Sequence, residues 1–402
     1  MLKSFRVDNF KSLVNLAFEP AGLNLLVGSN NAGKTNLCHA LRFLSLTSKM
    51  PVNDAAAECT PEPWNLLNVY ISSQSLTMAA VCELNLDGEL LTFTYELTLV
   101  SQKAPTRPVR RSLFAVSKEI LRISGGRFTD TILLENTAGQ VRLLHEKRFL
   151  RDHGSGDESP YVDTTAPVDT TMLCRLYDLE TNQRSNLFKR YLATWGYYSF
   201  EPSCLRNKTA RRSRGTLEGD GSNLMSVLFN VHNSRPRLAR KLIEATRLMD
   251  PRLDLFSFAN PDPDHVYMFF EDRRGNKFGV DSVSDGTLRH LAMSYLVFSA
   301  GDDPDQAEGS PLIMIEEPEN GIFVGHLREV FEKIEPSGRR GQFLFTSHNP
   351  YFIDLFDSAL DGLFLVKGGE IYSSLIKPDR AKLSDRLGKF SLGEMHFRGL
   401  LE

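Results

Sequence analysis

The first segments of the chain have the hydrophobic pattern of short β-strands. They begin at Leu2, Leu13 and Leu23, and the third, residues 23–27, is mostly apolar. A short apolar run of this kind is typical of a strand buried on both faces. A glycine-rich turn follows, and apolar residues then recur at helical spacing from about residue 34 to residue 46. We therefore expect a strand, a glycine-rich turn and a helix in succession.

The middle of the chain changes from strand-like to helical periodicity. Residues 68–145 alternate apolar and polar positions between turns such as Asp87-Gly88, which predicts antiparallel hairpins. Residues 151–169 are polar and rich in turn residues, as in a loop or insertion. Residues 180–250 have mainly helical spacing. Three further strands are expected at residues 266–270, 312–315 and 342–345, with a last helix and a strand at 362–372 after them.

Composition narrows the class of protein without identifying it. The 402 residues are 41% hydrophobic and 24% charged, as in an ordinary globular protein, and the net charge of -3 gives no overall attraction to nucleic acid. The five cysteines show no CxxC spacing, which favours reduced intracellular thiols. The sequence shows no signal-peptide pattern and no apolar stretch near the ~20 residues of a membrane span. We expect a cytoplasmic protein without membrane contact.

The strongest chemical signal is a complete phosphate-loop motif between the third strand and the first helix. Its pattern G-x-x-x-x-G-K-T runs from Gly28 to Thr35. Backbone N–H groups of such a loop surround a phosphate, and the following helix adds its positive N-terminal end. Lys34 is expected to bind the β- and γ-phosphates, and the Thr35 hydroxyl to bind Mg²⁺. The predicted ATP contacts in this segment are Asn30, Asn31, Ala32, Gly33, Lys34, Thr35 and Asn36.

A second signal is the apolar strand at residues 312–315, which ends in two carboxylates. Glu316 is expected to hold Mg²⁺ directly or through water, and Glu317 to act as the general base for the attacking water. Many strands end in acidic turns, so this segment alone is a moderate signal.

Two weaker motifs each have an ordinary structural explanation. In Val283-Ser284-Asp285-Gly286-Thr287, Ser284 or Asp285 could simply cap the following helix. The functional alternative is a phosphate-binding signature, in which Ser284 and the Gly286 N–H grip a γ-phosphate. His348 ends the strand that begins near residue 342 and could either mark a polar turn or contact the γ-phosphate and the attacking water.

The order of the four motifs resembles that of ABC-type ATPase heads. They start near Gly28, Ser284, Glu316 and His348, and the chain opens with an Asn-Phe-Lys-Ser turn at residues 9–12. These features are similar to the RecF, SMC and OLD-type branch, and most similar to small standalone bacterial ATPases labelled AAA-type. Two motifs depart from the common pattern: Glu316 stands where many members have Asp, and the signature differs from that of transporters. The Gln that contacts Mg²⁺ in many heads is not assigned, with Gln74, Gln140 and Gln183 as candidates.

The resemblance implies an α/β P-loop NTPase fold, an ABC-ATPase head with an antiparallel β lobe and a helical insertion. We expect four parts: residues 1–100 and 281–402 forming the two halves of the head, residues 101–200 forming a variable β-rich or loop insertion, and residues 201–280 forming a helical lobe. It also implies ATP and Mg²⁺ as cofactors, and a homodimer or higher even-numbered oligomer. In such a dimer, Ser284 and Gly286 of one copy complete the site that Lys34 of the other copy begins.

The implied function is an ATP-hydrolysing switch in bacterial anti-phage defence or DNA maintenance, acting with a separate effector such as a nuclease or toxin. The alternative is a scaffold that binds ATP and turns it over slowly. Direct DNA binding stays open, because the basic groups at 206–214, 103–111 and 235–241 could equally be solvated surface. The acidic group at 262–265 is interpreted as a turn and that at 302–305 as a loop before the strand at 312, rather than as metal sites.

Overall fold

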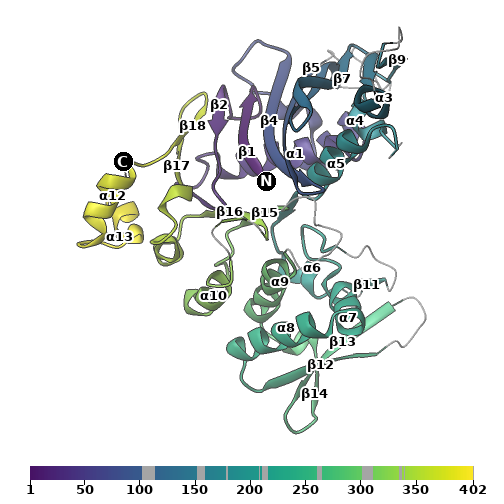
Figure 1. The fold of residues 1–402 in the computed structure, drawn as a ribbon. Helices are drawn as coiled ribbons and strands as arrows, with labels where there is room; N and C mark the ends of the chain where they lie inside the picture. The colour runs from purple at the N-terminus through teal and green to yellow at the C-terminus, as the bar shows by residue number, and fades with distance from the viewer. Residues whose placement is uncertain are drawn as a thin grey trace.

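The computed structural model describes ten stretches of the chain: residues 1–101, 114–151, 159–177, 180–207, 209–210, 216–259, 265–300, 311–334, 337–338 and 340–401. Within them, the strands form a mixed six-stranded sheet, a large antiparallel sheet and a small sheet in a separate lobe. Figure 1 shows the large antiparallel sheet above the six-stranded sheet and the lobe below it.

The six-stranded sheet is the centre of the fold. Its order is β10-β15-β16-β3-β17-β18, and only the last pair is antiparallel. Alternate residues of its strands enter two separate cores: Leu312 and Met314 point to one, Ile313 and Ile315 to the other. Burial of both faces explains the mostly apolar sequences of the inner strands β3, β15 and β16, whereas the outer strands β10 and β18 are only partly buried. The strands are β3 (Leu23–Val27), β10 (Gly196–Tyr198), β15 (Leu312–Glu316), β16 (Gln342–Ser347), β17 (Leu363–Gly368) and β18 (Ser373–Ile376).

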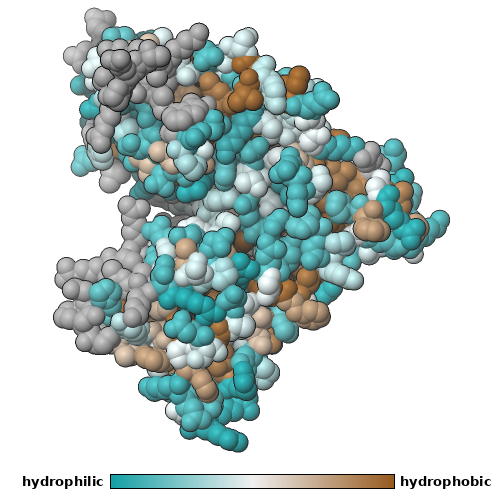
Figure 2. All heavy atoms as spheres, turned by 180° about the vertical axis from the view of Figure 1, so that it is seen from behind, coloured by the Kyte–Doolittle hydropathy of each residue, from teal (hydrophilic) through white to brown (hydrophobic). Residues whose placement is uncertain are grey.

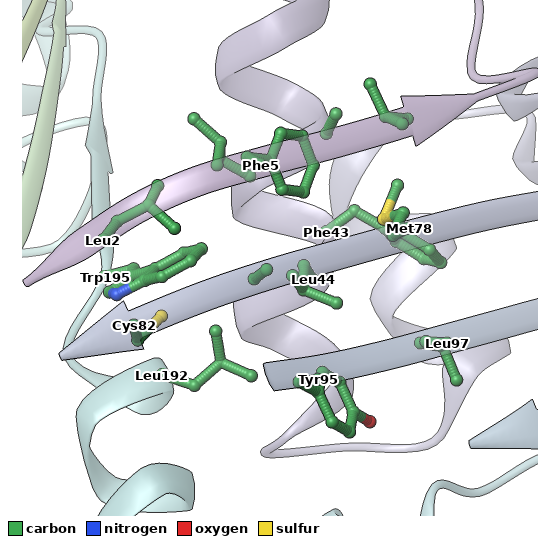
Figure 3. Close-up of a cluster of buried hydrophobic side chains, with 14 of the residues drawn as sticks. Leu2, Phe5, Phe43, Leu44, Met78, Cys82, Tyr95, Leu97, Leu192 and Trp195 are labelled. Atoms are coloured by element: carbon green, nitrogen blue, oxygen red, sulfur yellow. The ribbon is translucent and has the colours of Figure 1, made fainter. Parts of the chain in front are cut away.

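The antiparallel sheet packs over helix α1 (Lys34–Thr47) to form the first core. Figure 3 shows Phe43 and Leu44 of α1 against Phe5, Met78 and other side chains of this sheet. Its strands, in sheet order, are β2 (Leu16–Phe18), β1 (Leu2–Asp8), β4 (Ser75–Leu86), β5 (Glu89–Ser101), β6 (Phe114–Gly125), β7 (Phe128–Thr137), β8 (Gln140–Leu144) and β9 (Tyr161–Thr165). Its companion helices are α2 (Val52–Cys59), α3 (Glu146–Arg151), α4 (Met172–Arg175) and α5 (Gln183–Ala193).

The second core joins the other face of the six-stranded sheet to a helical lobe. The lobe's helices are α6 (Pro202–Leu205), α7 (Leu224–Ser234), α8 (Pro236–Met249) and α9 (Asp285–Ser299). It also carries antiparallel strands, in which β13 pairs with β11, β12 and β14. These are β11 (Thr209–Ala210), β12 (Leu253–Ala259), β13 (His265–Asp272) and β14 (Lys277–Gly279).

The last part of the chain returns to the edge of the six-stranded sheet. The strand expected at residues 362–372 is two strands, β17 and β18, because the chain reverses after Gly368. The remaining helices are α10 (Val324–Phe331), α11 (Pro350–Ile353), α12 (Arg380–Leu387) and α13 (Leu392–Phe397), and short 3-10 turns lie at Pro63–Leu66, Val280–Ser282, Asp354–Phe356 and Leu360–Gly362.

Two of the predicted boundaries between the four parts fall inside structural units of the fold. The boundary at residue 100 falls inside β5, because the antiparallel lobe already starts with β4 and is continuous with β1. The boundary at residue 280 separates α8 from α9, although these helices pack directly against each other in one lobe. The domain division therefore remains a proposal.

The described surface gives few direct hints of function. Figure 2 shows one face, on which hydrophilic side chains predominate and apolar ones form separate patches. Over the described ranges, every helix is too short or too polar to cross a lipid bilayer. All five cysteines are free.

Candidate nucleotide-binding site

The candidate site lies where the parallel strands end. β3, β15, β16 and β10 all present their carboxyl ends to one edge of the six-stranded sheet, the usual place for a ligand in a fold of this kind. A cavity of about 610 Å³ opens there, facing α9. Ten of the twelve predicted site residues line this cavity: Asn30, Asn31, Ala32, Gly33, Lys34, Thr35, Asn36, Glu316, Glu317 and His348.

The phosphate loop is shaped by close packing around Gly33. This residue has φ 105° and precedes the first residue of α1. A Cβ here would lie 2.2 Å from Ser373 Oγ and 2.9 Å from Ser12 Oγ, so only glycine fits. The Asn36 amide donates a hydrogen bond to Ser12 Oγ, which is also bonded to Ser373 Oγ. The turn at residues 9–12 and strand β18 thus hold the start of α1 in place.

Lys34 is folded back onto its own loop. Its Nζ donates hydrogen bonds of 2.7 Å to Gly28 O and 2.9 Å to Ser29 O. Burial lowers the pKa of the Lys34 ammonium, and the neighbouring carboxylates, Glu317 first among them, oppose this shift. The ammonium is therefore confined to the loop that would surround a phosphate, among carboxylates that partly balance its charge.

Glu316 lines the cavity, and only one of its two carboxylate oxygens accepts a hydrogen bond from a described residue. Its Oε2 accepts a 2.6 Å hydrogen bond from the Tyr197 hydroxyl, while Oε1 is buried and has no hydrogen-bond partner among the described residues. Thr35 and Glu316 both line the cavity. An unpaired buried carboxylate oxygen suits a cation, and Mg²⁺ is commonly held by one or two protein ligands together with phosphates and water. In the part of the chain that the structure describes, no cluster of three or more His, Cys, Asp or Glu side chains offers a separate metal site. The residues present therefore fit a nucleotide-bound Mg²⁺.

Glu317 has an unusual backbone conformation and two side-chain contacts. Its φ of 39° lies in the left-handed region, which non-glycine residues rarely adopt, and its N–H donates to Thr346 O of the neighbouring strand. The Asn320 amide donates to Glu317 Oε2 at 2.8 Å, and His348 Nδ1 lies 3.1 Å from Oε1. Strained residues that are held this firmly are found preferentially at functional sites.

Ser284 and Gly286 are the two predicted residues that lie outside the cavity. The exposed Ser284 caps α9, accepting a hydrogen bond from Thr287 N at 3.1 Å. A Cβ on Gly286 would approach Gly321 O to 2.3 Å, so the turn carrying Ser284 packs against the turn that follows Glu317. Arg206 braces the same turn by donating to Val283 O at 2.8 Å and pairing with Asp285. The capping role is observed; the phosphate-binding role stays a prediction.

Several cavity residues were not predicted from the sequence. Arg289 reaches the cavity from α9 and donates hydrogen bonds to Asn320 O and Phe200 O. Glu201 lies on the segment that follows β10, and none of the candidate glutamines at 74, 140 and 183 is a lining residue. Glu319 does not line the cavity: it is buried beside Ser347, which donates to its Oε1, and burial raises the pKa of its carboxyl. Two of these cavity residues adjoin predicted motifs: Asn320 follows the double-acid motif, and Arg289 follows the Ser284–Thr287 signature in a run that resembles the family. Glu201 has no such signal.

Most of the charged segments considered for other roles lie outside the described residues. These are residues 103–111, most of 206–214, Asp262, Asp264 and 302–305. The third basic group is at the start of α8, where Arg237, Arg240 and Lys241 are exposed. Its position is compatible with either solvent or DNA.

Comparison with solved structures shows the same fold in one SMC head. The crystal structure of the SmcHead bound to the C-winged helix domain of ScpA matches with a TM-score of 0.55, at 12% identity, over 95% of this chain and 99% of that chain. The SMC head domain from Thermotoga maritima matches at 12% identity and a TM-score of 0.42, over 94% and 99%. The first match shows the P-loop ATPase fold expected for an ABC-type head.

A family comparison gives the closer assignment. No curated protein sequence matches the chain significantly. The profile of the family described as "AAA domain, putative AbiEii toxin, Type IV TA system" matches residues 23–354, which include all four motifs. The chain, with the fold of an ABC-type ATPase head of the SMC, RecF and OLD branch, therefore belongs to this AAA-domain family.

Proposed function

We propose that the protein is an ATP-hydrolysing switch whose two active sites form between two copies of the chain. The observation that carries the proposal is the division of the predicted site residues. The phosphate loop, Glu316, Glu317 and His348 share one cavity, whereas Ser284 stands exposed at the N-terminus of α9, outside it. A second copy would bring its Ser284 and Gly286 N–H to the γ-phosphate.

The residues of the cavity divide the chemistry between them. Lys34 and the N–H groups at the start of α1 would bind the β- and γ-phosphates, once the ammonium leaves its contacts with Gly28 O and Ser29 O. Thr35 and Glu316 would hold Mg²⁺, which neutralises charge on the phosphate oxygens. Glu317 would orient the attacking water and accept its proton, while His348 would contact the γ-phosphate and the same water.

In such a dimer, ATP binding and ATP hydrolysis have opposite effects on the contact between the two heads. Two ATP molecules between two heads would join them, and loss of the γ-phosphate would remove the group that both copies contact. The long-range consequence is a switch between joined and separate heads. We propose a homodimer as the basic unit, with larger even-numbered assemblies built from it.

The cellular role is proposed from the family description. A family named for a putative toxin of a type IV toxin–antitoxin system supports work in bacterial anti-phage defence, with DNA maintenance as the related alternative. We propose that the switch controls a separate effector protein, a nuclease or a toxin, and that the exposed basic group on α8 allows DNA contact.

The experiment measures ATP turnover and dimer formation by purified protein, with and without DNA. Wild-type protein should hydrolyse ATP, and the Glu317→Gln variant should form a dimer that persists with ATP. The Lys34→Ala variant should do neither. If wild-type protein forms an ATP-stabilised dimer but shows negligible turnover, the scaffold that turns ATP over slowly is the better description. A protein that binds no ATP would contradict both.

A further inference from the structure

A continuous row of four side chains connects the partly buried turn after β1 to the carboxylate of Glu316. Lys11 Nζ lies 2.8 Å from His39 Nδ1, and His39 Nε2 lies 3.2 Å from the Tyr197 hydroxyl. The Tyr197 hydroxyl donates to Glu316 Oε2 at 2.6 Å. The members come from the turn at residues 9–12, helix α1, strand β10 and strand β15.

The chemistry of the groups gives this row one direction. A lysine ammonium can only donate, so His39 Nδ1 must accept from Lys11. Burial, together with the charges of Lys11 and Arg42, lowers the pKa of His39 to about 3, so the ring is neutral and carries its proton on Nε2. Nε2 then donates to the Tyr197 oxygen, and the Tyr197 O–H donates to Glu316. Every donor therefore points towards the carboxylate.

Packing holds the middle of the row rigidly. The His39 and Tyr197 rings meet edge to face, with centroids 5.1 Å apart, and the Arg42 guanidinium lies over the Tyr197 ring at 5.3 Å. Lys11 sits in a turn closed by two hydrogen bonds between Phe10 and Leu13, with a left-handed φ of 48°. Such a conformation for a non-glycine residue indicates that its surroundings fix its position.

In this row, one carboxylate oxygen of Glu316 accepts a hydrogen bond and the other does not. Oε2 is occupied by Tyr197, and the buried Oε1 has no hydrogen-bond partner among the described residues. We propose that Lys11, His39 and Tyr197 form a relay of positioning residues that fixes the rotamer of Glu316 and keeps Oε1 directed to the cation of the bound nucleotide. This inference rests on the proposed nucleotide site, and it gives a role to the lysine of the Asn-Phe-Lys-Ser turn.

The relay acts through orientation and charge. Hydrogen bonds in a chain polarise one another, so the Lys11 charge strengthens the Tyr197 hydrogen bond across two neutral side chains. Loss of a group that orients a metal ligand commonly costs about 10- to 100-fold in metal affinity. A purely structural role for Tyr197 would instead lower stability without a selective effect on the cation.

The test measures Mn²⁺ binding by electron paramagnetic resonance, using the full chain saturated with a non-hydrolysable ATP analogue. Tyr197→Phe should raise the Mn²⁺ dissociation constant about tenfold or more. Binding of the analogue in EDTA should be unchanged, because the relay does not touch the phosphate loop. Tyr198→Phe is the matched control, since it removes a hydroxyl from the next residue of β10, which lies outside the cavity lining; it should bind Mn²⁺ as wild type does.

A double-mutant cycle separates the relay from a simple contact. Lys11→Met should weaken Mn²⁺ binding by itself, although it lies two side chains away from Glu316, and should add nothing to Tyr197→Phe. Unchanged Mn²⁺ affinity in both single variants, or full additivity of their effects, would overturn the relay. If Tyr197→Phe does not fold, the Lys11→Met result decides. Wild-type protein that binds neither the analogue nor Mn²⁺ would instead refute the proposed nucleotide site.

Discussion

His348 Nδ1 lies 3.1 Å from Oε1 of Glu317, which joins the ends of two neighbouring parallel strands across the candidate site. The second oxygen of Glu317 accepts a hydrogen bond from Asn320. Both carboxylate oxygens are thus fixed by side chains that the backbone brings together at residues 317–320 and 348. This arrangement suits a base that must hold one orientation towards a water molecule in the cavity.

Replacing Glu317 by Gln should abolish most ATP turnover and leave nucleotide binding intact. The amide keeps the shape of the side chain but cannot accept the proton of the attacking water, so turnover should fall roughly 10²–10⁴-fold. Steady-state phosphate release and equilibrium binding of a fluorescent ATP analogue measure the two effects. The exposed Glu332→Gln variant is the matched control, and hydrolysis by Glu317→Gln at the wild-type rate would show that another group is the base.

Replacing His348 by Gln should also slow ATP hydrolysis, because His348 and Glu317 act as a pair. Loss of one transition-state donor typically costs about 10²-fold, and His348 also positions Glu317. The two residues should therefore be non-additive: the double variant should turn over no more slowly than Glu317→Gln alone. If the loss of kcat in the double variant equals the product of the losses in the two single variants, the two residues do not share a role.

Gly286→Ala should damage the turn that carries Ser284. The new Cβ would meet Gly321 O at 2.3 Å, so one of the two turns must shift, at a cost of about 1–3 kcal/mol in the free energy of unfolding. Gly388→Ala is the control, because a Cβ there meets no atom within 4 Å. Thermal denaturation should show a lower midpoint for Gly286→Ala alone; equal midpoints would mean that the two turns are not in close contact.

Stability should depend on pH through the buried His290 of α9. Burial lowers its pKa from 6.5 to about 4, and its Nε2 lies 3.2 Å from His326 O. The unfolded chain then binds more protons between these values, so this contribution to stability is complete above pH 6.5 and is lost as the pH falls towards 4. Its slope is at most about 1.4 kcal/mol per pH unit.

The pH effect is measured as the difference between variants. His290→Gln keeps a hydrogen-bond donor but does not titrate, so its unfolding free energy should decline less steeply than that of wild type between pH 6.5 and 4. His232→Gln, at an exposed position, should follow wild type. Parallel curves for wild type and His290→Gln would show that this histidine is not the titrating group.

The local parts of the site could be predicted from the sequence because each motif adjoins a strongly patterned element. The run at 23–27 is β3, the helix expected from residue 34 to 46 is α1 to residue 47, and the double-acid strand is β15. Their proximity follows from the parallel pairing of β3, β16 and β15. At this edge of the sheet, the order of the motifs along the chain was enough to predict which residues share the cavity.

The contacts between distant segments could not be predicted in this way. Tyr197 is 119 residues from Glu316, on a three-residue strand with no motif and no clear periodicity. Arg289 belongs to α9, whose apolar spacing indicates a helix but not that its side chain crosses to the turn after Glu317. The pairing of Gln342 with the backbone of Leu2 likewise depends on tertiary packing between β16 and β1, which are 340 residues apart in the sequence.

Ser284→Arg and Lys34→Ala, assayed separately and mixed, test most directly whether ATP is shared between copies. If Ser284 acts on the partner's nucleotide, each variant alone should be inactive, and random 1:1 mixing should restore about a quarter of wild-type turnover, since half the dimers regain one of two sites. Full activity of Ser284→Arg alone, or no gain in turnover on mixing after exchange of subunits has been verified, would contradict the shared site.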